Sequence, residues 1–343
     1  MIRRCFLQVT DLTKRFGDHV AVRDLTLGVP CGSILALLGP SGSGKTTTLR
    51  LLAGFEQPDA GKIQIDELDV TGQSPVERRF GMVFQHYALF PHLDVGENIA
   101  FGLAQKDASA RATRVATVLA MVDLEGFERR KVGELSGGQQ QRVAVARALA
   151  PEPTVLLLDE PLSNLDPSLR ERTRRELREV LVKSGVTTVF VTHEQDEAFA
   201  LADRIAVLHD GRLEQVGTAR ELYESPMTRF VATFVGRASV LPGTMVTAER
   251  ARLDGGAEWT VSSPAPIAPG QRVDVVVRPE LLAFAGQGLS GTVRSRRYAG
   301  ARTLFEVDAA GASVEVEGVA DEAEPGQAVH LVAQRARAFP MAG

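Results

Sequence analysis

Residues 39–46 read Gly-Pro-Ser-Gly-Ser-Gly-Lys-Thr and fill every fixed position of the pattern G-x-x-x-x-G-K-[ST]. Glycines have no Cβ, so they let successive backbone N–H groups turn inward around phosphate oxygens. Lys45 can reach the terminal phosphates of a nucleoside triphosphate, and the hydroxyl of Thr46 can ligate Mg²⁺. The pattern predicts a phosphate-binding loop, for which a glycine-rich turn without function is the plain alternative.

Three further side chains could act on a bound triphosphate. Asp159 and Glu160 are adjacent, and paired carboxylates repel each other unless a cation or a proton lies between them. Asp159 is therefore placed to hold Mg²⁺, and Glu160 to accept a proton from a water that attacks the γ-phosphate. His193 is a candidate for the same edge of the site, although a lone histidine is more often structural.

All of these residues follow segments that we expect to be buried strands. The apolar run 34–38 precedes the glycine-rich loop, and residues 46–53 read as a helix that Gly54 ends. The apolar runs 155–158 and 187–192 are typical of strands inside a parallel sheet. Ligand sites of such sheets lie beyond the carboxyl ends of the strands, so the candidate residues should meet at one edge. The predicted fold class is α/β.

The composition indicates a soluble globular protein with two domains. The chain has 343 residues, of which 44% are hydrophobic and 24% charged. A net charge of −4 argues against a broad nucleic-acid-binding surface. Cys5 and Cys31 are too few for a disulfide framework or a zinc site, which favours a reducing compartment. The N-terminus forms no apolar signal-peptide core, and glycine and proline break the charge-free run 25–44, so neither predicts a membrane segment.

Two domains are expected, at residues 1–236 and 237–343. Within the first, residues 88–150 show helical spacing and read as a helical subdomain, with Asp94 and Glu97 in a capping box. Beyond the boundary lysine disappears, and short alternating runs lie between glycine and proline. That pattern predicts a small β-barrel.

Taken together, the motifs resemble those of the ATP-binding cassette (ABC) ATPases. Residues 135–139, Leu-Ser-Gly-Gly-Gln, match the family signature, which separates this family from GTPases, kinases and helicases. The resemblance covers about residues 6–236, with no element missing. In chain order the other matches are Walker A at residues 39–46, the Q-loop glutamine at Gln85, Walker B at residues 155–160, the D-loop at residues 163–166 and the switch histidine at His193.

The resemblance implies a role for each matched residue, with ATP as the nucleotide and Mg²⁺ as its metal. Glu160 would polarise the attacking water, and His193 would contact the γ-phosphate. Thr46 and Gln85 would ligate Mg²⁺, with Asp159 supporting it. These expectations agree with the chemistry read from the residues themselves.

Cassettes of this family pack head to tail in pairs, and only one cassette is present here, so a homodimer, or pairing with a similar chain, is implied. The family usually has tyrosine where Phe16 stands, and phenylalanine can still stack on adenine. Val22 is placed at the same base, and Asp166 is the D-loop aspartate. Ser136, Gly137, Gly138 and Gln139 would close over ATP held by the partner. The residues expected to bind nucleotide within one chain are Phe16, Val22, Gly39, Pro40, Ser41, Gly42, Ser43, Gly44, Lys45, Thr46 and Thr47.

Within the family, the chain looks like the ATPase subunit of a bacterial importer. It has no fused membrane span and no coiled-coil insertion, and residues 84–93 are similar to the segment after the Q-loop in importer ATPases. Residues 277–280 and 298–300 look like parts of their C-terminal TOBE domain, which resembles a small oligonucleotide-binding-type barrel. The resemblance implies two permease subunits as partners, an extracytoplasmic substrate-binding protein indirectly, no nucleic acid, and a peripheral place on the cytoplasmic face of the bacterial inner membrane.

Several alternatives stay open at this point. Residues 85–101, with the exposed-looking aromatics Tyr87 and Phe90, are predicted to form the groove for a permease helix, with internal packing as the alternative. Ferric iron or a polyamine is the favoured cargo, with sugar, sulfate, molybdate or phosphonate as alternatives. The second domain would bind a regulatory ligand or serve dimerisation. A soluble ABC ATPase of nucleic acid or ribosomes is the competing function, and intact Glu160 and His193 count against a module that does not hydrolyse.

Overall fold

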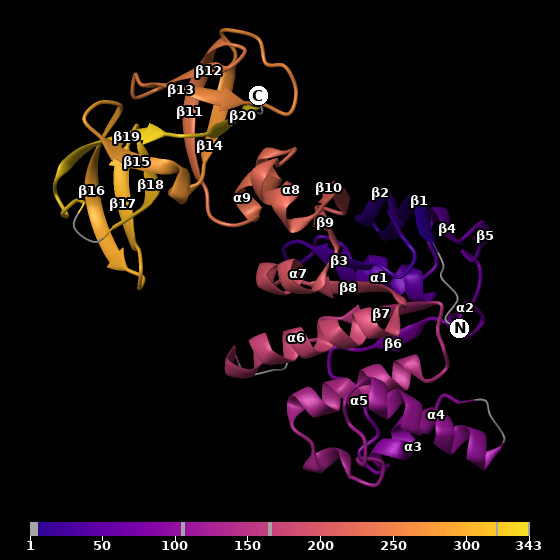
Figure 1. Cartoon of the computed structure of the whole chain (residues 1–343). Helices are drawn as coiled ribbons and strands as arrows, with labels where there is room; N and C mark the ends of the chain where they lie inside the picture. The colour runs from indigo at the N-terminus through magenta and orange to yellow at the C-terminus, as the bar shows by residue number, and fades with distance from the viewer. Residues whose placement is uncertain (1–5, 104–106, 164–166, 320–321, 342–343) are drawn as a thin grey trace. The chain divides into compact units, whose positions relative to one another are not determined.

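The computed structural model describes residues 6–103, 107–163, 167–319 and 322–341 (Figure 1). The chain divides into two compact units, residues 1–219 and residues 220–343, and each is described by itself. The sequence placed the domain boundary at residues 236 and 237. In the structure, helix α9 (Arg229–Phe234) groups with the second unit, because its Ala232 packs against Val276 and Phe339 there.

A six-stranded sheet is the centre of the first unit. Its spatial order is β10 (Arg212–Gly217), β9 (Arg204–His209), β3 (Ile34–Leu38), β8 (Thr187–Thr192), β7 (Val155–Asp159) and β6 (Gly81–Val83). Every neighbouring pair is parallel except β9 with β10. Strands β3 and β8 are buried at every position, as expected for apolar runs in a parallel sheet covered on both faces. The predicted α/β class is confirmed.

A second, antiparallel sheet of the first unit has the order β2 (His19–Val29), β1 (Leu7–Phe16), β4 (Ala60–Ile65) and β5 (Leu68–Asp69). Alternate residues of β1, beginning with Leu7 and Val9, point into the core, because successive side chains of a strand face opposite sides. They share one hydrophobic cluster with Leu35 and Leu37 of β3 and Leu49 of helix α1 (Lys45–Ala53). The core of this unit therefore lies between its two sheets, and α1 is part of it.

The remaining helices of the first unit are α2 (Pro75–Arg78), α3 (Val95–Ala100), α4 (Ala108–Met121), η1 (Val132–Glu134), α5 (Gly137–Leu149), α6 (Pro167–Ser184) and α7 (Gln195–Leu201). Helices α3, α4 and α5 contact one another, and α5 contacts β6 (Figure 1). They lie within residues 88–150, the segment predicted to be helical. Across the described ranges, no helix is both long and apolar enough to cross a bilayer.

The start of α3 is fixed by the predicted capping box. The Oδ1 of Asp94 accepts from the backbone N–H of Glu97, and the Oε2 of Glu97 accepts from the backbone N–H of Asp94, both at 2.8 Å. Asn98 is fully buried, and its amide exchanges hydrogen bonds with both backbone groups of Phe90. The segment before α3 is thus pinned to the first turn of that helix.

The expected exposure of Tyr87 is wrong. Its side chain is only 5% exposed, although the backbone there has a φ of 61°. Burial, with the nearby charge of Glu197, raises the pKa of Tyr87 to about 12. Phe90 is half-buried, with its ring 4.4 Å from that of Phe101, and Phe101 itself is 65% exposed. Among the Tyr and Phe residues of this segment, the exposed one is therefore Phe101.

Arg78, which is 4% exposed, joins α2 to the end of α1. Its guanidinium donates to the carbonyls of Leu51 and Leu52 in the last turn of α1, and to that of Thr71 at 2.7 Å. Because removal would take the guanidinium donor from the buried carbonyl of Leu52 and from that of Thr71, we expect Arg78→Met to lower the free energy of unfolding by about 3 kcal/mol or more. Urea unfolding measures this, with exposed Arg79→Met as the control at less than about 0.5 kcal/mol. Equal losses in the two variants would contradict the assignment.

In the second unit, five strands close into a barrel, and one of the alternating runs that predicted a barrel, residues 273–277, lies in it. The barrel order is β11 (Ser239–Thr247), β12 (Arg250–Leu253), β13 (Glu258–Ser262), β20 (Ala336–Pro340) and β14 (Arg272–Val277). Closure depends on the chain's last strand, since β20 pairs in parallel with β13 and antiparallel with β14. Helices α8 (Ala219–Glu224) and α9 precede the barrel, and α9 contacts β14.

The second unit also contains a five-stranded sheet that the sequence did not separate from the barrel. Its order is β15 (Leu282–Ala285), β19 (Ala328–Ala333), β16 (Leu289–Tyr298), β17 (Thr303–Ala309) and β18 (Ala312–Gly318), and the short helix η2 (Pro279–Leu281) leads into it. One hydrophobic cluster extends from the barrel, with Leu241 and Trp259, to this sheet, with Phe305 and Val307. Alternation shows that a strand is half-buried, but it does not show which sheet the strand joins.

Candidate nucleotide-binding site

The strand order gathers four of the predicted motifs at one edge of the six-stranded sheet. Residues 39–44 follow β3, His193 follows β8, Asp159 ends β7 with Glu160 directly after it, and Gln85 lies just beyond β6. These four strands are consecutive neighbours in the sheet and are parallel, so their carboxyl ends meet at the same edge. This is the edge at which α/β sheets bind ligands.

Two glycines of residues 39–46, Gly39 and Gly44, are required by the space around the loop. Gly44 precedes α1 with a φ of 94°, in the left-handed region, and a Cβ there would lie 2.3 Å from the carbonyl oxygen of Ala21. A Cβ on Gly39 would lie 2.2 Å from the carbonyl oxygen of Leu208. A side chain at either position would displace backbone. The loop therefore follows β3 closely and delivers the N-terminus of α1, an anion-binding end, to the site.

Lys45 is the first residue of α1 and is only 6% exposed. Its Nζ donates to the carbonyl oxygens of Gly39 at 2.9 Å and Pro40 at 2.8 Å. Burial lowers the pKa of Lys45, and the charge of Glu160 acts in the opposite direction. The ammonium group is therefore held inside the loop, where it can meet an anion that the backbone amides surround.

Glu160 lies at the centre of the polar contacts at this edge. Its Oε2 accepts from the Nε2 of Gln85 at 3.0 Å, and its Oε1 lies 3.1 Å from the Nδ1 of His193. The backbone of Glu160 is left-handed, with a φ of 43°, and its carbonyl oxygen accepts from the hydroxyl of Ser163 at 3.0 Å. A non-glycine residue in this region is strained, and such strain clusters at functional sites. The structure thus joins three predicted residues that lie far apart in the sequence.

Asp159 and its neighbours have the chemistry of a Mg²⁺ site. Burial raises the pKa of Asp159, the charge of Glu160 raises it further, and Arg50 opposes both. Thr46 is exposed at the start of α1, so a hydroxyl, an amide and a carboxylate are available from Thr46, Gln85 and Asp159. Oxygen donors with few carboxylates suit Mg²⁺, which keeps water and substrate phosphates among its ligands. In the part of the chain that the structure describes, no cluster of three His, Cys, Asp or Glu residues could hold a metal by itself.

Thr192 and Glu197, which were not among the predicted site residues, hold His193 in place. The Oγ1 of Thr192 donates to the Oε2 of buried Glu197 at 2.7 Å and accepts from the backbone N–H of Glu194 at 3.0 Å. These bonds fix the turn between β8 and α7 on both sides of the histidine. Ser163 has a comparable effect on Glu160. No sequence signal reveals these contacts, because the burial of Glu197 depends on the tertiary packing of α7.

The two residues predicted at the adenine differ in the structure. Phe16 ends β1 with its side chain 47% exposed, and the Nζ of Lys14 lies 5.3 Å from the ring centroid. Val22 is fully buried in the hydrophobic cluster of the first unit. The side chain of Val22 thus presents no surface to a base. Phe16 keeps an open aromatic face that can stack on one.

The signature residues form a second helix N-terminus. Ser136 caps the 13-residue helix α5, and a capping box joins it to Gln139: the backbone N–H of Ser136 donates to Oε1 of Gln139 at 2.9 Å. Ser136 is exposed, and Gly137, Gly138 and Gln139 are half-exposed. Among the residues that the structure describes, no hydrogen bond joins this turn to the glycine-rich loop. Asp166 lies outside the described residues.

The other predicted nucleotide-binding residues belong to the loop or follow it directly, and they differ in how far they are buried. Thr47 and Pro40 are half-buried. Ser43 is buried, with its Oγ 3.5 Å from the Nζ of Lys45. Ser41 and Gly42 are exposed at the tip. The exposed tip and the backbone amides behind it are the parts of such a loop that a phosphate contacts.

Comparisons with known proteins agree with this geometry. A family model described as ABC transporter matches residues 22–163, and one described as TOBE domain matches residues 275–341. The chain is 46% identical to a sulfate/thiosulfate import ATP-binding protein of Xanthomonas campestris pv. campestris, over 97% of this chain and 99% of the relative. It is 43% identical to an Fe(3+) ions import ATP-binding protein of Pectobacterium atrosepticum, over 94% and 92%. It is 46% identical to a spermidine/putrescine import ATP-binding protein of Rubrobacter xylanophilus, over 87% and 82%.

A solved structure supports the fold independently. The chain matches the dimeric structure of a post-hydrolysis state of an ATP-binding cassette bound to ADP and Pi, with a TM-score of 0.53 and 33% identity. That match covers 62% of this chain and 98% of the solved one. The glycine-rich loop, the carboxylates after β7 and the capped turn before α5 lie in the part described by the family model. The chain therefore belongs to the ABC transporter family, as an ATP-binding-cassette ATPase with a C-terminal TOBE domain.

Proposed function

We propose that this chain is the ATP-hydrolysing subunit of an import complex, and that it works as a homodimer with two permease subunits in the membrane. The observation that carries the proposal is the contact of Gln85 and His193 with the two carboxylate oxygens of Glu160, beside the loop that holds Lys45. The relatives whose names state an activity are import ATP-binding proteins, which favours import over an action on nucleic acid or ribosomes.

In the proposed mechanism the loop binds and Glu160 moves a proton. The backbone amides of residues 39–46 and the ammonium of Lys45 bind the phosphates of ATP. Thr46, Gln85 and Asp159 would hold Mg²⁺, which neutralises charge on the phosphate oxygens when bound. Glu160 accepts the proton of the attacking water.

His193 completes the arrangement from the neighbouring strand end. It lies 3.1 Å from Glu160, so it can orient that carboxylate and also reach the γ-phosphate. Thr192 and Glu197 keep the histidine at this position through the bonds described above. We therefore assign proton acceptance to Glu160 and a positioning contact to His193.

A second copy completes each site in this proposal. The exposed turn at Ser136 to Gln139 presents backbone N–H groups at the start of α5, which suits the γ-phosphate of ATP held by the partner. The solved cassettes that resemble this chain are described as dimeric. ATP would then join two subunits, and its hydrolysis would release them.

The shared site predicts that the hydrolysis rate per chain depends on protein concentration. Since one copy lacks the closing turn, the rate per chain should rise with concentration and reach a plateau when the dimer dominates. A steady-state ATPase assay with Mg²⁺ over a hundredfold dilution of the protein measures this rate. Adding Ser136→Arg chains in excess should lower the rate per wild-type chain. A rate per chain that stays constant down to concentrations at which size-exclusion chromatography shows only monomer would rule out the shared site.

We place the permease contact at a groove in the helical part of the first unit. The groove has a volume of about 620 Å³, and its walls come from α3, α4 and the segment before η1. Phe101 lies at its wall, 65% exposed, with its ring tilted against that of Phe90. An exposed aromatic beside apolar Leu103 and Val115 suits an amphipathic helix that lays its apolar face into a groove.

This assignment predicts that Phe101→Asp uncouples hydrolysis from transport. Because Phe101 is exposed, the variant should fold and hydrolyse ATP normally, whereas transport should fall by at least about tenfold, as expected for an aromatic anchor of an interface. Uptake by reconstituted vesicles, with ATPase activity measured in the same preparation, tests this. Val76→Asp, at a side chain 85% exposed on α2, is the matched control. Uptake that survives in Phe101→Asp would place the contact elsewhere.

The import assignment also implies where the subunit works. As part of a complex with a permease it would lie on the cytoplasmic face of the membrane as a peripheral protein, with an extracytoplasmic binding protein delivering the cargo. The relatives named above are import ATP-binding proteins for sulfate/thiosulfate, Fe(3+) ions or spermidine/putrescine, and they are 43–46% identical to this chain. Identity therefore does not favour ferric iron or a polyamine over sulfate. Uptake of each of the three by a deletion strain, with and without this chain, decides among them.

A further inference from the structure

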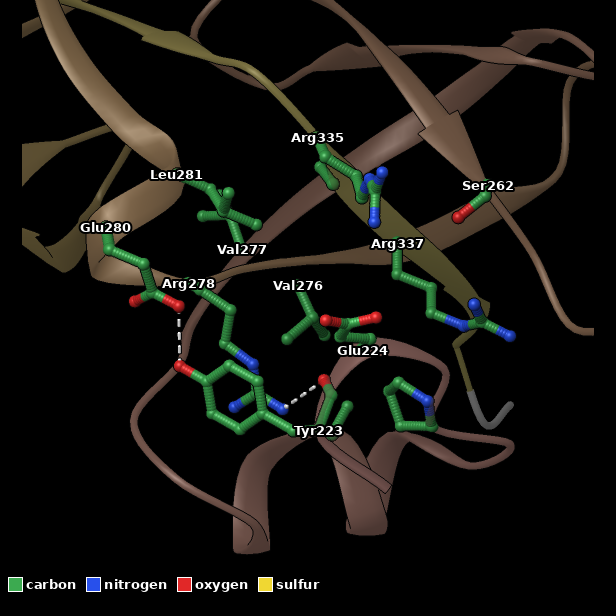
Figure 2. A pocket seen from close by; sticks show the side chains of 13 residues that line it. Tyr223, Glu224, Ser262, Val276, Val277, Arg278, Glu280, Leu281, Arg335 and Arg337 are labelled. Carbon is green, nitrogen blue, oxygen red and sulfur yellow. Dashed lines mark hydrogen bonds between the residues drawn. The ribbon is translucent and has the colours of Figure 1, made fainter. Parts of the chain in front are cut away.

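A cavity of about 180 Å³ lies within the second unit, between helices α8 and α9 and the barrel strands β13, β14 and β20 (Figure 2). An apolar cavity of 150 Å³ is large enough for one benzene ring. Most of its wall is apolar, with Val276 and Val277 from β14, Ala232 from α9 and Ala336 from β20. The space thus suits a small organic molecule rather than a few ordered waters.

Most charged groups at the cavity are already paired. Arg278 is buried and donates to the carbonyls of Val235 at 2.6 Å and Tyr223 at 3.1 Å. The hydroxyl of Tyr223 donates to Glu280 at 2.6 Å, and Figure 2 draws this hydrogen bond as a dashed line. Both oxygens of Glu224 accept from the Nε of Arg220 at 3.0 Å. These groups shape the cavity and hold α8 to the barrel, but their charges are largely compensated.

Two arginines at the cavity have no such partner. Arg337 is the second residue of β20 and Arg335 lies in the bend just before it, and both side chains border the cavity. Neither makes an ion pair with another residue that the structure describes, and the Nε of Arg337 is buried without an acceptor. Ser262 of β13 is the register partner of Arg337 and adds a hydroxyl to the same wall. The cavity wall thus carries two positive charges that a bound anion would neutralise.

We propose that this cavity binds a small organic carboxylate, with the carboxylate on Arg335 and Arg337 and the apolar body against Val276 and Ala336. Guanidinium groups bind carboxylates through two parallel hydrogen bonds, and Arg337 has a donor with no other acceptor. An inorganic oxyanion would satisfy the arginines but leave the apolar wall without contact. Such a ligand would join α8 and α9 to the barrel, a site separate from the nucleotide residues of the first unit.

Four probes separate the chemistry of the ligand. On the full chain, isothermal titration should show that benzoate binds with one site per chain, and its binding should raise the midpoint of thermal unfolding. Benzyl alcohol, which lacks the charge, and inorganic sulfate, which lacks the apolar body, should each bind at least about tenfold more weakly, since tenfold in affinity is about 1.4 kcal/mol. Benzylamine should not bind. Tighter binding of benzylamine would mean that Glu224 and Glu280 dominate, and equal binding of sulfate would mean a simple anion site; either result overturns the proposal.

Variants connect the binding to the two arginines. Arg335→Gln, at an exposed side chain, should weaken benzoate binding, and the double variant Arg335→Gln/Arg337→Gln should weaken it by at least about tenfold. Arg297→Gln, at an exposed arginine of β16, is the control and should leave binding unchanged. The unfolding midpoint of each ligand-free variant shows that the unit is folded. Benzoate binding that is equal in Arg335→Gln and Arg297→Gln would show that the two arginines do not hold the ligand, and would overturn the proposal.

Discussion

Replacing Glu160 with glutamine should nearly abolish ATP hydrolysis while leaving ATP binding intact. Glutamine has the same shape and can still accept one hydrogen bond from Gln85 or His193, so the local geometry should survive. An amide cannot accept the proton of the attacking water. Loss of a general base typically costs a factor of about 10² to 10⁴ in rate. Single-turnover hydrolysis and ATP affinity, measured on the same preparation, test the two halves of the expectation.

The same variant should accumulate as a dimer when ATP is present. If hydrolysis releases the subunits, blocking hydrolysis keeps ATP between them, and size-exclusion chromatography should show twice the mass with ATP and not with ADP. Glu125→Gln, at an exposed glutamate, is the matched control and should hydrolyse normally. Wild-type hydrolysis by Glu160→Gln would mean that another group accepts the proton. If Glu160→Gln lost hydrolysis but stayed monomeric in ATP, the result would support Glu160 as the proton acceptor and would contradict a site shared between two subunits.

The local part of the site could be predicted from the sequence. The loop at residues 39–46 requires a strand before it and a helix after it, and both lie within a few residues of the motif. The strands that end in Asp159 and Thr192 could be predicted from apolar runs, since a central parallel strand is buried on both faces. Each of these expectations depends on neighbours in sequence, and each is present in the structure.

The contacts of Glu160 could not be predicted in the same way. Its partners Gln85 and His193 lie 75 and 33 residues away, and only the strand order brings the three together. Tyr87 shows the opposite error, because an aromatic in a polar segment looks exposed until the packing around it is known. The second sheet of the C-terminal unit was missed for a related reason. Alternation reports burial on one side of a strand and carries no information about its partners.

Replacing Lys45 with alanine should weaken nucleotide binding itself. A charge-assisted hydrogen bond to phosphate contributes about 1.5–3 kcal/mol, which corresponds to a loss of affinity of about 10- to 150-fold. Lys62→Ala, at an exposed lysine of β4, is the control and should bind ATP normally. Fluorescence titration with ATP measures the difference. Unchanged affinity in Lys45→Ala would contradict the assignment of the loop.

Loss of affinity in Lys45→Ala has two possible origins, and a second nucleotide separates them. The Nζ of Lys45 also donates to the carbonyls of Gly39 and Pro40, so its removal could loosen the loop as well as remove a charge from the phosphates. AMP has no β- or γ-phosphate, and its binding depends on the base, the ribose and the α-phosphate only. We expect Lys45→Ala to weaken ATP binding much more than AMP binding, because the ammonium acts on the terminal phosphates. An equal loss for both nucleotides would show that Lys45 acts by holding the loop, and would move the recognition of the terminal phosphates to the backbone amides and the partner's signature turn.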